Sequence, residues 1–131
     1  AAILNFRLKN LAKIINKRRE NAKFYMNNLN KKFIFMPKEN PNEFNTHHTF
    51  VIQVDRRDEL KNFLKKRGID TTIHYPVPIH LQTASKYLGY KKGSFPETEN
   101  QAKKILTLPI HQYLEQKDIL RISKTINEFL K

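Results

Sequence analysis

Residues 49–73 read TFVIQVDRRDELKNFLKKRGIDTTI, and this stretch decides the fold class. Its beginning, Thr49–Val54, is rich in β-branched and aromatic residues, which favours a buried strand. A helical pattern follows over 56–67, and Gly68 is the residue expected just after the end of that helix. Residues 69–73 predict the next strand. Two strands joined through one helix indicate a small α/β unit.

Towards the C-terminus, Pro76 and Pro78 fix an extended backbone path that a helix cannot follow. The remaining apolar spacing and the turn residues predict two short helices, a short strand and a closing helix. These elements are expected over residues 83–88, 97–106, 107–108 and 115–130.

The N-terminal residues 2–29 contain no proline or glycine, and their apolar positions recur at the spacing of an amphipathic helix. At about 1.5 Å per residue such a helix is about 40 Å long, which is more than the rest of so small a domain can cover. Part of its apolar stripe should therefore need another partner. The chain opens on Ala1-Ala2-Ile3-Leu4 without a capping residue, so we expect a fragment or processed product that begins inside a helix; a natural terminus with frayed ends is the other interpretation.

The length of 131 residues suits one domain with its own core, and 39% hydrophobic residues give it enough apolar surface to fold. No apolar run is long enough to span a membrane, and the first residues lack the pattern of a signal peptide, so we expect a cytoplasmic protein without a membrane partner. The absence of cysteine excludes disulfides, thiolate metal sites and cysteine nucleophiles.

The net charge of +13 raises the possibility of an anionic partner, because Lys and Arg contacts to phosphate release counterions. Much of the excess lies in residues 1–36, which hold nine cations and the single acid Glu20. This charge distribution fits two interpretations: a solvated, lysine-rich helix face, or an interface for phosphate groups or an acidic partner.

Histidines mark the candidate site. His47 and His48 are adjacent and would point to opposite faces of a strand, so we expect no metal site. His74, Tyr75 and His80 lie on a loop stiffened by two prolines at a strand end, where α/β folds commonly place ligand-binding groups. We therefore predict substrate-binding roles for these three residues. The competing interpretation is a structural loop with a buried, hydrogen-bonded histidine.

The chain carries no complete catalytic apparatus. Its three glycines do not form a phosphate-binding loop, and no nucleophile lies in a recognisable pattern with a base. We expect neither catalytic nor cofactor-binding residues here.

Several segments, taken in order, resemble the DegT/DnrJ/StrS family of pyridoxal-phosphate-dependent sugar aminotransferases. The N-terminal helix resembles the linking helix of that family, and later segments resemble its C-terminal half. The segments are 1–4 with Leu8 and Leu11, Arg18–Ala22 with Tyr25, 57–60, 64–71, 74–82, 87–90, 95–99 and 106–111.

The resemblance implies an α/β (α+β) fold, the small C-terminal domain of the type I aminotransferase fold, with a short, mostly antiparallel sheet packed by helices. Residues 1–30 would be the long linking helix and 31–131 the small domain, with the domain that binds pyridoxal phosphate absent from this chain. The implied function is amino transfer, usually from glutamate, to a nucleotide-linked keto-sugar in polysaccharide, lipopolysaccharide or glycan biosynthesis. The implied full-length enzyme is a homodimer that uses pyridoxal 5'-phosphate, and none is expected bound to this fragment.

Within the family pattern, His80 would contact the sugar or phosphate of the substrate, Tyr75 would line the cleft, and His74 would support or contact the substrate. Arg18 and Arg19 match paired basic positions, which we interpret first as helix-face or dimer contacts and second as phosphate contacts. Other pyridoxal chemistry, such as dehydration, stays open because the lysine that would form the Schiff base lies outside this sequence. The alternative function is a basic nucleic-acid-binding or regulatory module, although we expect no specific binding of nucleic acid.

Overall fold

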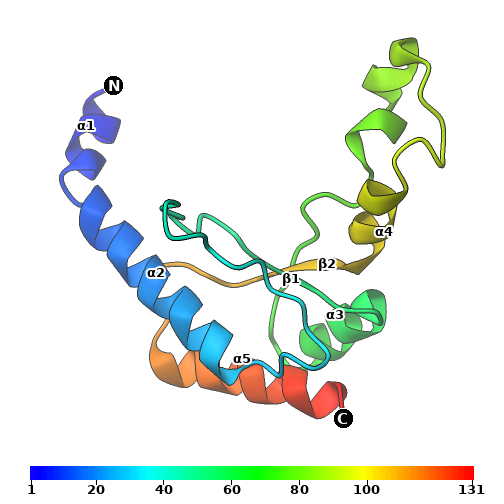
Figure 1. Ribbon diagram of the computed structural model, residues 1–131. Helices are drawn as coiled ribbons and strands as arrows, with labels where there is room; N and C mark the ends of the chain where they lie inside the picture. The colour runs from blue at the N-terminus through cyan, green and yellow to red at the C-terminus, as the bar shows by residue number, and fades with distance from the viewer.

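The computed structural model describes residues 1–131, and the chain has the shape of a U whose two arms rise from a common base (Figure 1). The N-terminal helices form one arm, and two 3-10 helices with α4 form the other. The base combines a two-stranded sheet with helices α3 and α5. The elements in chain order are α1 (Ala2–Leu8), α2 (Leu11–Asn28), β1 (Phe50–Gln53), α3 (Arg57–Lys66), η1 (Ile79–Leu81), η2 (Thr83–Leu88), α4 (Pro96–Lys104), β2 (Ile105–Leu108) and α5 (Gln116–Phe129).

The sheet separates the core from the space between the arms. Strands β1 and β2 are antiparallel, and Phe50 and Ile52 on β1 are buried. Val51 lies directly opposite Thr107, and because side chains alternate along a strand, both belong to the other face of the sheet. That face is the one on which the candidate site is built.

One hydrophobic core holds the base together. Helices α2 and α5 pack against each other, and the ring of Tyr25 on α2 stacks on Phe50 with centroids 5.0 Å apart. A fully buried large aliphatic side chain contributes about 1.5–3 kcal/mol, so the shared core fixes the helices relative to the sheet. The 17 buried residues of this cluster include Leu60, Leu64, Leu106, Ile119 and Ile126, all 0% exposed.

The expected end of the helix before Gly68 is confirmed. Gly68 has a φ of +69°, its N–H donates to the carbonyl of Lys65 at 3.0 Å, and the Ile69 N–H donates to Leu64 at the same distance. This pair of bonds caps the last carbonyls of α3 and needs a left-handed residue, which glycine adopts without strain.

The single helix predicted over residues 2–29 is instead two helices, α1 and α2, separated at Lys9 and Asn10. Asn10 leaves the helical region with φ −107° and ψ 2°, and its N–H donates to Arg7 rather than to the residue four positions before it. Asparagine is a poor helix-interior residue because its side chain competes for backbone hydrogen bonds in non-helical conformations. The spacing of the apolar residues continues unchanged across Lys9 and Asn10, so it did not predict that the helix ends there.

The strand predicted over residues 69–73 and the strand–helix–strand unit built on it were wrong. Only Thr72 pairs, in one bridge to Thr107 with N···O distances of 3.2 and 2.7 Å. The partner of β1 is β2, which begins at Ile105, two residues earlier than expected. Ile105 and Leu106 pair with β1 instead of continuing α4, while the segment after Ile73 runs into Pro76 and Pro78, which have no N–H to donate to a ladder.

The predicted fold class is confirmed: a short antiparallel sheet packed by helices, with helices preceding and following it. None of the helices is both long enough and apolar enough to cross a membrane.

Candidate functional site

The predicted loop leaves the sheet directly above β2. Thr72 is bonded to the backbone of Thr107, and two residues later Nδ1 of His74 lies 3.0 Å from the Thr107 hydroxyl. The ring of Tyr75 meets the His74 ring edge-on at 5.5 Å and is 70% exposed. The sheet therefore fixes the start of the loop and leaves the phenol free to contact a ligand.

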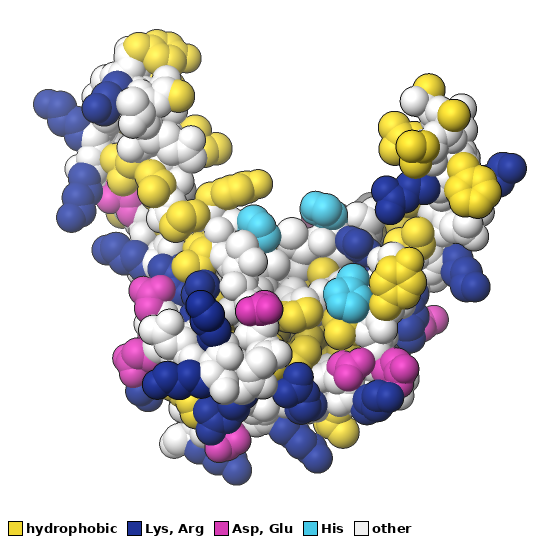
Figure 2. Space-filling view, turned by 180° about the vertical axis from the view of Figure 1, so that it is seen from behind, with side chains coloured by type: hydrophobic (Ala, Val, Ile, Leu, Met, Phe, Trp, Pro, Cys, Tyr) yellow, Lys and Arg dark blue, Asp and Glu magenta, His cyan; other side chains and the backbone are white.

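His74 and Tyr75 line a pocket of about 630 Å³ on the face of the sheet that looks into the U. Val51 and Thr107, the pair that lie opposite each other in the sheet, form part of its floor. Figure 2 shows histidine side chains exposed between the two arms of the molecule. The remaining lining residues are Arg18 on α2, His48 and Thr49 before β1, and Leu108, Ile110 and His111 at the end of β2.

The polar groups around this pocket are hydrogen-bond donors and neutral or basic side chains. A guanidinium, three imidazoles and the hydroxyls of Thr49, Tyr75 and Thr107 line it, and no carboxylate and no lysine does. Such a set can bind the hydroxyl and anionic oxygens of a ligand and can hold or pass a proton at an imidazole. None of these side chains carries an amine to which a ligand could be attached covalently.

Arg18 and Arg19, the paired basic residues, have different surroundings. Nη1 of Arg18 donates to the carbonyl of His48 at 3.2 Å, and its Nε is enclosed and has no acceptor. Nη1 of Arg19 donates to Glu39 at 2.7 Å and to the carbonyl of Asn45 at 2.6 Å. Arg19 is thus satisfied inside the chain, whereas Arg18 lines the pocket and has an enclosed donor without a partner.

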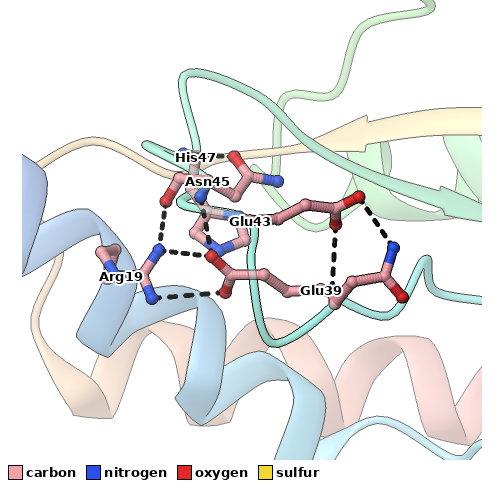
Figure 3. A network of polar contacts seen from close by, with 6 residues as sticks. Arg19, Glu39, Glu43, Asn45 and His47 are labelled. Atoms are coloured by element: carbon pink, nitrogen blue, oxygen red, sulfur yellow. Dashed lines mark hydrogen bonds and ion pairs between the residues drawn. The ribbon is translucent and has the colours of Figure 1, made fainter.

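Figure 3 shows how Arg19 anchors the loop that leads into β1. Oε1 of Glu39 accepts hydrogen bonds from Arg19 and from the N–H of Asn45, each at 2.7 Å, and the Asn45 side chain accepts from the N–H of His47 at 2.8 Å. The bonds from Arg19 and Asn45 hold the pKa of the Glu39 carboxyl below its ordinary value. This network precedes His48 by one residue, so it sets where His48 enters the pocket.

His47 is a structural member of the same loop. It is 6% exposed, has a φ of +47°, and its burial lowers the pKa of its imidazole. Its neighbour His48 is exposed and lines the pocket. The two adjacent histidines thus have opposite environments, as expected, but both lie before β1 and not on a strand.

His80 lies apart from this pocket. It is 8% exposed, and its Nε2 is 3.0 Å from Oε1 of Glu99, which also accepts the N–H of Gly93 at 2.7 Å. Partial desolvation acts to raise the pKa of Glu99, but the bonds from His80 and Gly93 outweigh it, so this pKa lies below its ordinary value. The structure brings His74 and Tyr75 together and places His80 inside the second arm.

Sequence reasoning did not select His48, Thr107 and His111 as site residues, and it gave Arg18 only a secondary role. The missing information was the pairing of β1 with β2, which joins segments more than 50 residues apart. The polar residues that flank both strands, Thr49 before β1 and His111 after β2, are the signal that could have identified this face once the pairing was known.

Comparison with known proteins places the chain in context. Residues 1–127 match the DegT/DnrJ/EryC1/StrS aminotransferase family. The chain is 37% identical over 130 residues to the dTDP-3-amino-3,4,6-trideoxy-alpha-D-glucose transaminase of Streptomyces venezuelae. This alignment covers 98% of this chain and 34% of the relative. The chain is 36% identical over 134 residues to the pleiotropic regulatory protein of Geobacillus stearothermophilus, covering 100% and 36% of the two chains.

Among solved structures, the crystal structure of S. venezuelae DesV in complex with a ketimine intermediate superposes with a TM-score of 0.94 at 36% identity, covering 99% of this chain and 35% of that one. A DegT/DnrJ/EryC1/StrS aminotransferase from Brucella abortus superposes with a TM-score of 0.88 at 32% identity, covering 98% and 34%. The chain therefore spans about a third of the length of the relatives it matches.

Proposed function

The chain belongs to the DegT/DnrJ/EryC1/StrS aminotransferase family, and from that membership we propose that it is the C-terminal part of a pyridoxal-phosphate-dependent enzyme that aminates a nucleotide-linked keto-sugar. The observation that carries the proposal is the pocket that His74, Tyr75 and Arg18 line together. In this role the chain contributes one wall of the substrate cleft.

The side chains of the pocket suit a sugar. Tyr75 offers an exposed aromatic face and a phenol, which can cover a pyranose ring and bond one of its hydroxyls. His74 is held at Nδ1 by Thr107, so its other ring nitrogen is available to the ligand in a fixed orientation. A ring held this way loses little freedom when a substrate binds.

The substrate contact proposed for His80 stays a prediction. In this structure its imidazole bonds Glu99, and a contact with substrate would have to come from the remaining edge of the ring or from a shift of the arm. Its ring also meets Phe95 edge-on at 4.9 Å, so it also stabilises the second arm.

The cofactor implied by the family, pyridoxal phosphate, would supply the electron sink for amino transfer when bound. The pocket of this chain does not supply the lysine that such a cofactor requires for covalent attachment, because none lines it. We propose that this lysine belongs to the larger domain, to which residues 1–30 would connect the small domain 31–131.

The further partners follow from the same proposal. The amino donor would be glutamate, the full enzyme a cytoplasmic homodimer, and the product an amino-sugar precursor of a polysaccharide, lipopolysaccharide or glycan. The names of two relatives, both transaminases of dTDP-linked amino sugars, support the substrate class. The alternative of a basic nucleic-acid-binding or regulatory module has no support from the relatives whose names state an enzymatic activity.

The test is amino transfer by the enzyme that carries this chain. Purified with pyridoxal phosphate and glutamate, it should release many equivalents of 2-oxoglutarate per active site when supplied with dTDP- or UDP-linked keto-sugars, and no more than one equivalent with the free sugars. No more than one equivalent with either nucleotide series, in protein that retains cofactor, would reject the proposal.

A companion experiment addresses the cofactor. The 131-residue chain is incubated with pyridoxal phosphate, reduced with borohydride and digested, and the modified lysines are found by mass spectrometry. We expect only scattered, substoichiometric modification. Stoichiometric labelling of one lysine would show that the chain itself holds the cofactor.

A further inference from the structure

We propose that Arg18, His48 and His111 form an oxyanion subsite in the pocket over the sheet, which takes a carboxylate or phosphate group of a substrate. This inference rests on the proposed function and adds to it by assigning three residues outside the predicted loop to an anionic group. It also gives a role to Arg18 that differs from that of its neighbour Arg19.

Arg18 has an unused hydrogen-bond donor. Its Nη1 donates to the carbonyl of His48, and its Nε–H is enclosed without an acceptor. Buried donors are nearly always paired, so an unpaired Nε–H in a residue that lines a pocket points to a ligand as its acceptor, reached when the groups that cover the Nε atom move aside. The Nε edge of a guanidinium offers two parallel N–H groups, which fit the two oxygens of a carboxylate or phosphate.

The neighbouring Arg19 has different surroundings, so the unpaired donor is specific to position 18. Arg19 has a carboxylate partner in Glu39 within the chain, and no carboxylate lines the pocket that Arg18 enters. The guanidinium of Arg18 keeps its charge at any physiological pH. An incoming anion would therefore meet a positive charge that no protein carboxylate has neutralised.

The histidines complete the subsite from the two strands. His48 precedes β1 and is tied to Arg18 through its carbonyl, and His111 follows β2, with its carbonyl held by Nδ2 of Asn21 at 3.1 Å. Asn21 is buried on the same helix as Arg18, so α2 fixes the backbone of both histidines. The imidazoles of His48 and His111 and the guanidinium of Arg18 thus line one pocket, and hydrogen bonds hold the backbone of both histidines in place.

In an amino transfer to a nucleotide sugar, two different substrates carry an oxyanion that this subsite could bind. The phosphates of the nucleotide and the carboxylates of the amino donor are both recognised by guanidinium and imidazole donors. A pocket of about 630 Å³ is much larger than either group and leaves room for the rest of the substrate beside Tyr75.

The test uses the five histidines of the chain as internal reporters. The imidazole resonances are followed by NMR while the 131-residue chain is titrated with inorganic phosphate and, separately, with glutarate, at constant ionic strength. We expect saturable shifts at His48, His74 and His111 and none at His47 and His80, which lie outside the pocket lining. Saturation by phosphate assigns the subsite to the nucleotide, and saturation by glutarate assigns it to the amino donor.

The matched variants are Arg18→Gln and Lys23→Gln, which remove the same charge from the same helix. Arg18→Gln should weaken binding at least about tenfold, and Lys23→Gln, an exposed position outside the pocket, should not. Arg18→Lys keeps the charge without the two-pronged edge, and should recover only part of the affinity. Backbone amide spectra check that each variant keeps the fold.

Equal weakening in both glutamine variants, or no saturable shift with either anion, would overturn the subsite. Neither outcome depends on cofactor or on a keto-sugar. If the complete enzyme aminates nucleotide sugars but the 131-residue chain binds neither anion, the subsite is rejected and the proposed function stands. If the chain binds an anion but the complete enzyme does not aminate nucleotide sugars, the proposed function is rejected and the subsite stands.

Discussion

The hydroxyl of Thr107 lies 3.0 Å from Nδ1 of His74, and this contact ties the loop that follows Ile73 to β2. It joins residues 33 positions apart. Because the backbone of Thr107 also pairs with Thr72, the strand holds the loop by both its main chain and its side chain. The position of His74 in the pocket is therefore a property of the sheet.

Thr107→Val tests this contact. The substitution keeps the shape of the side chain and removes its hydroxyl, so we expect a loss of about 0.5–1.5 kcal/mol in unfolding free energy and a changed chemical shift of the His74 ring. Urea denaturation and histidine NMR measure the two effects. Thr125→Val, which removes a hydroxyl bonded to Arg121 within α5, is the control. A His74 resonance unchanged in Thr107→Val would contradict the contact.

Glu39→Gln tests the loop network through pH. Because the folded pKa of Glu39 lies below its ordinary value, its stabilisation is fully present above about pH 4.5 and is lost as pH falls through the lowered folded pKa. The variant should be less stable than the unsubstituted chain at pH 7, and the difference should shrink as the pH approaches 3. Denaturation midpoints at several pH values measure it. Glu97→Gln is the charge-matched control, and a pH-independent difference for Glu39→Gln would contradict the mechanism.

Glu99→Gln tests how the second arm is held. The Glu99 carboxylate bonds both His80 and the N–H of Gly93, so its loss should loosen the segment between them. Hydrogen exchange of the backbone amides over η2 and the following turn should become faster, while exchange in β1 stays unchanged. Glu97→Gln, on the exposed side of the same helix, should change neither. Equal exchange in both variants would show that the arm is held by other contacts.

Ile52→Ala and Val51→Ala test the two faces of β1. Ile52 is 0% exposed in the core, so its truncation should cost about 2–5 kcal/mol in unfolding free energy. Val51 faces the pocket and is only half-buried, so its truncation should cost clearly less. Chemical denaturation compares the two. Similar costs would contradict the assignment of faces from the strand register.

The sequence predicts the elements of this fold better than their pairing. Local signals placed β1, α3 with Gly68, the short helix ending at Gly89 and the closing helix, because capping and periodicity act within a few residues. The break at Asn10 and the strand pairing were missed. Pairing depends on contacts between distant segments. Thr72 pairs with Thr107 and β1 pairs with β2, and neither segment alone determines its partner.

The same limit applies to the site. His74 and Tyr75 were predicted because prolines and a strand end mark such positions locally, and both line the pocket, while their contact with a substrate stays a prediction. Arg18, His48 and His111 come from three other segments, and only the folded sheet brings them together. The competing interpretation of a buried, hydrogen-bonded histidine describes the surroundings of His80, but its partner Glu99 lies 19 residues along the chain and could not be named from the local pattern.

The measurement that tests the central claim most directly is the kcat/KM of the complete enzyme for the nucleotide-linked keto-sugar proposed as its substrate. It is compared in His74→Ala and Tyr75→Ala, with Tyr87→Ala, an exposed tyrosine outside the pocket, as control. If this chain forms one wall of the sugar cleft, kcat/KM should fall at least about tenfold in the first two variants and stay unchanged in the control, with cofactor content equal in all. Unchanged kcat/KM in both His74→Ala and Tyr75→Ala would contradict the claim.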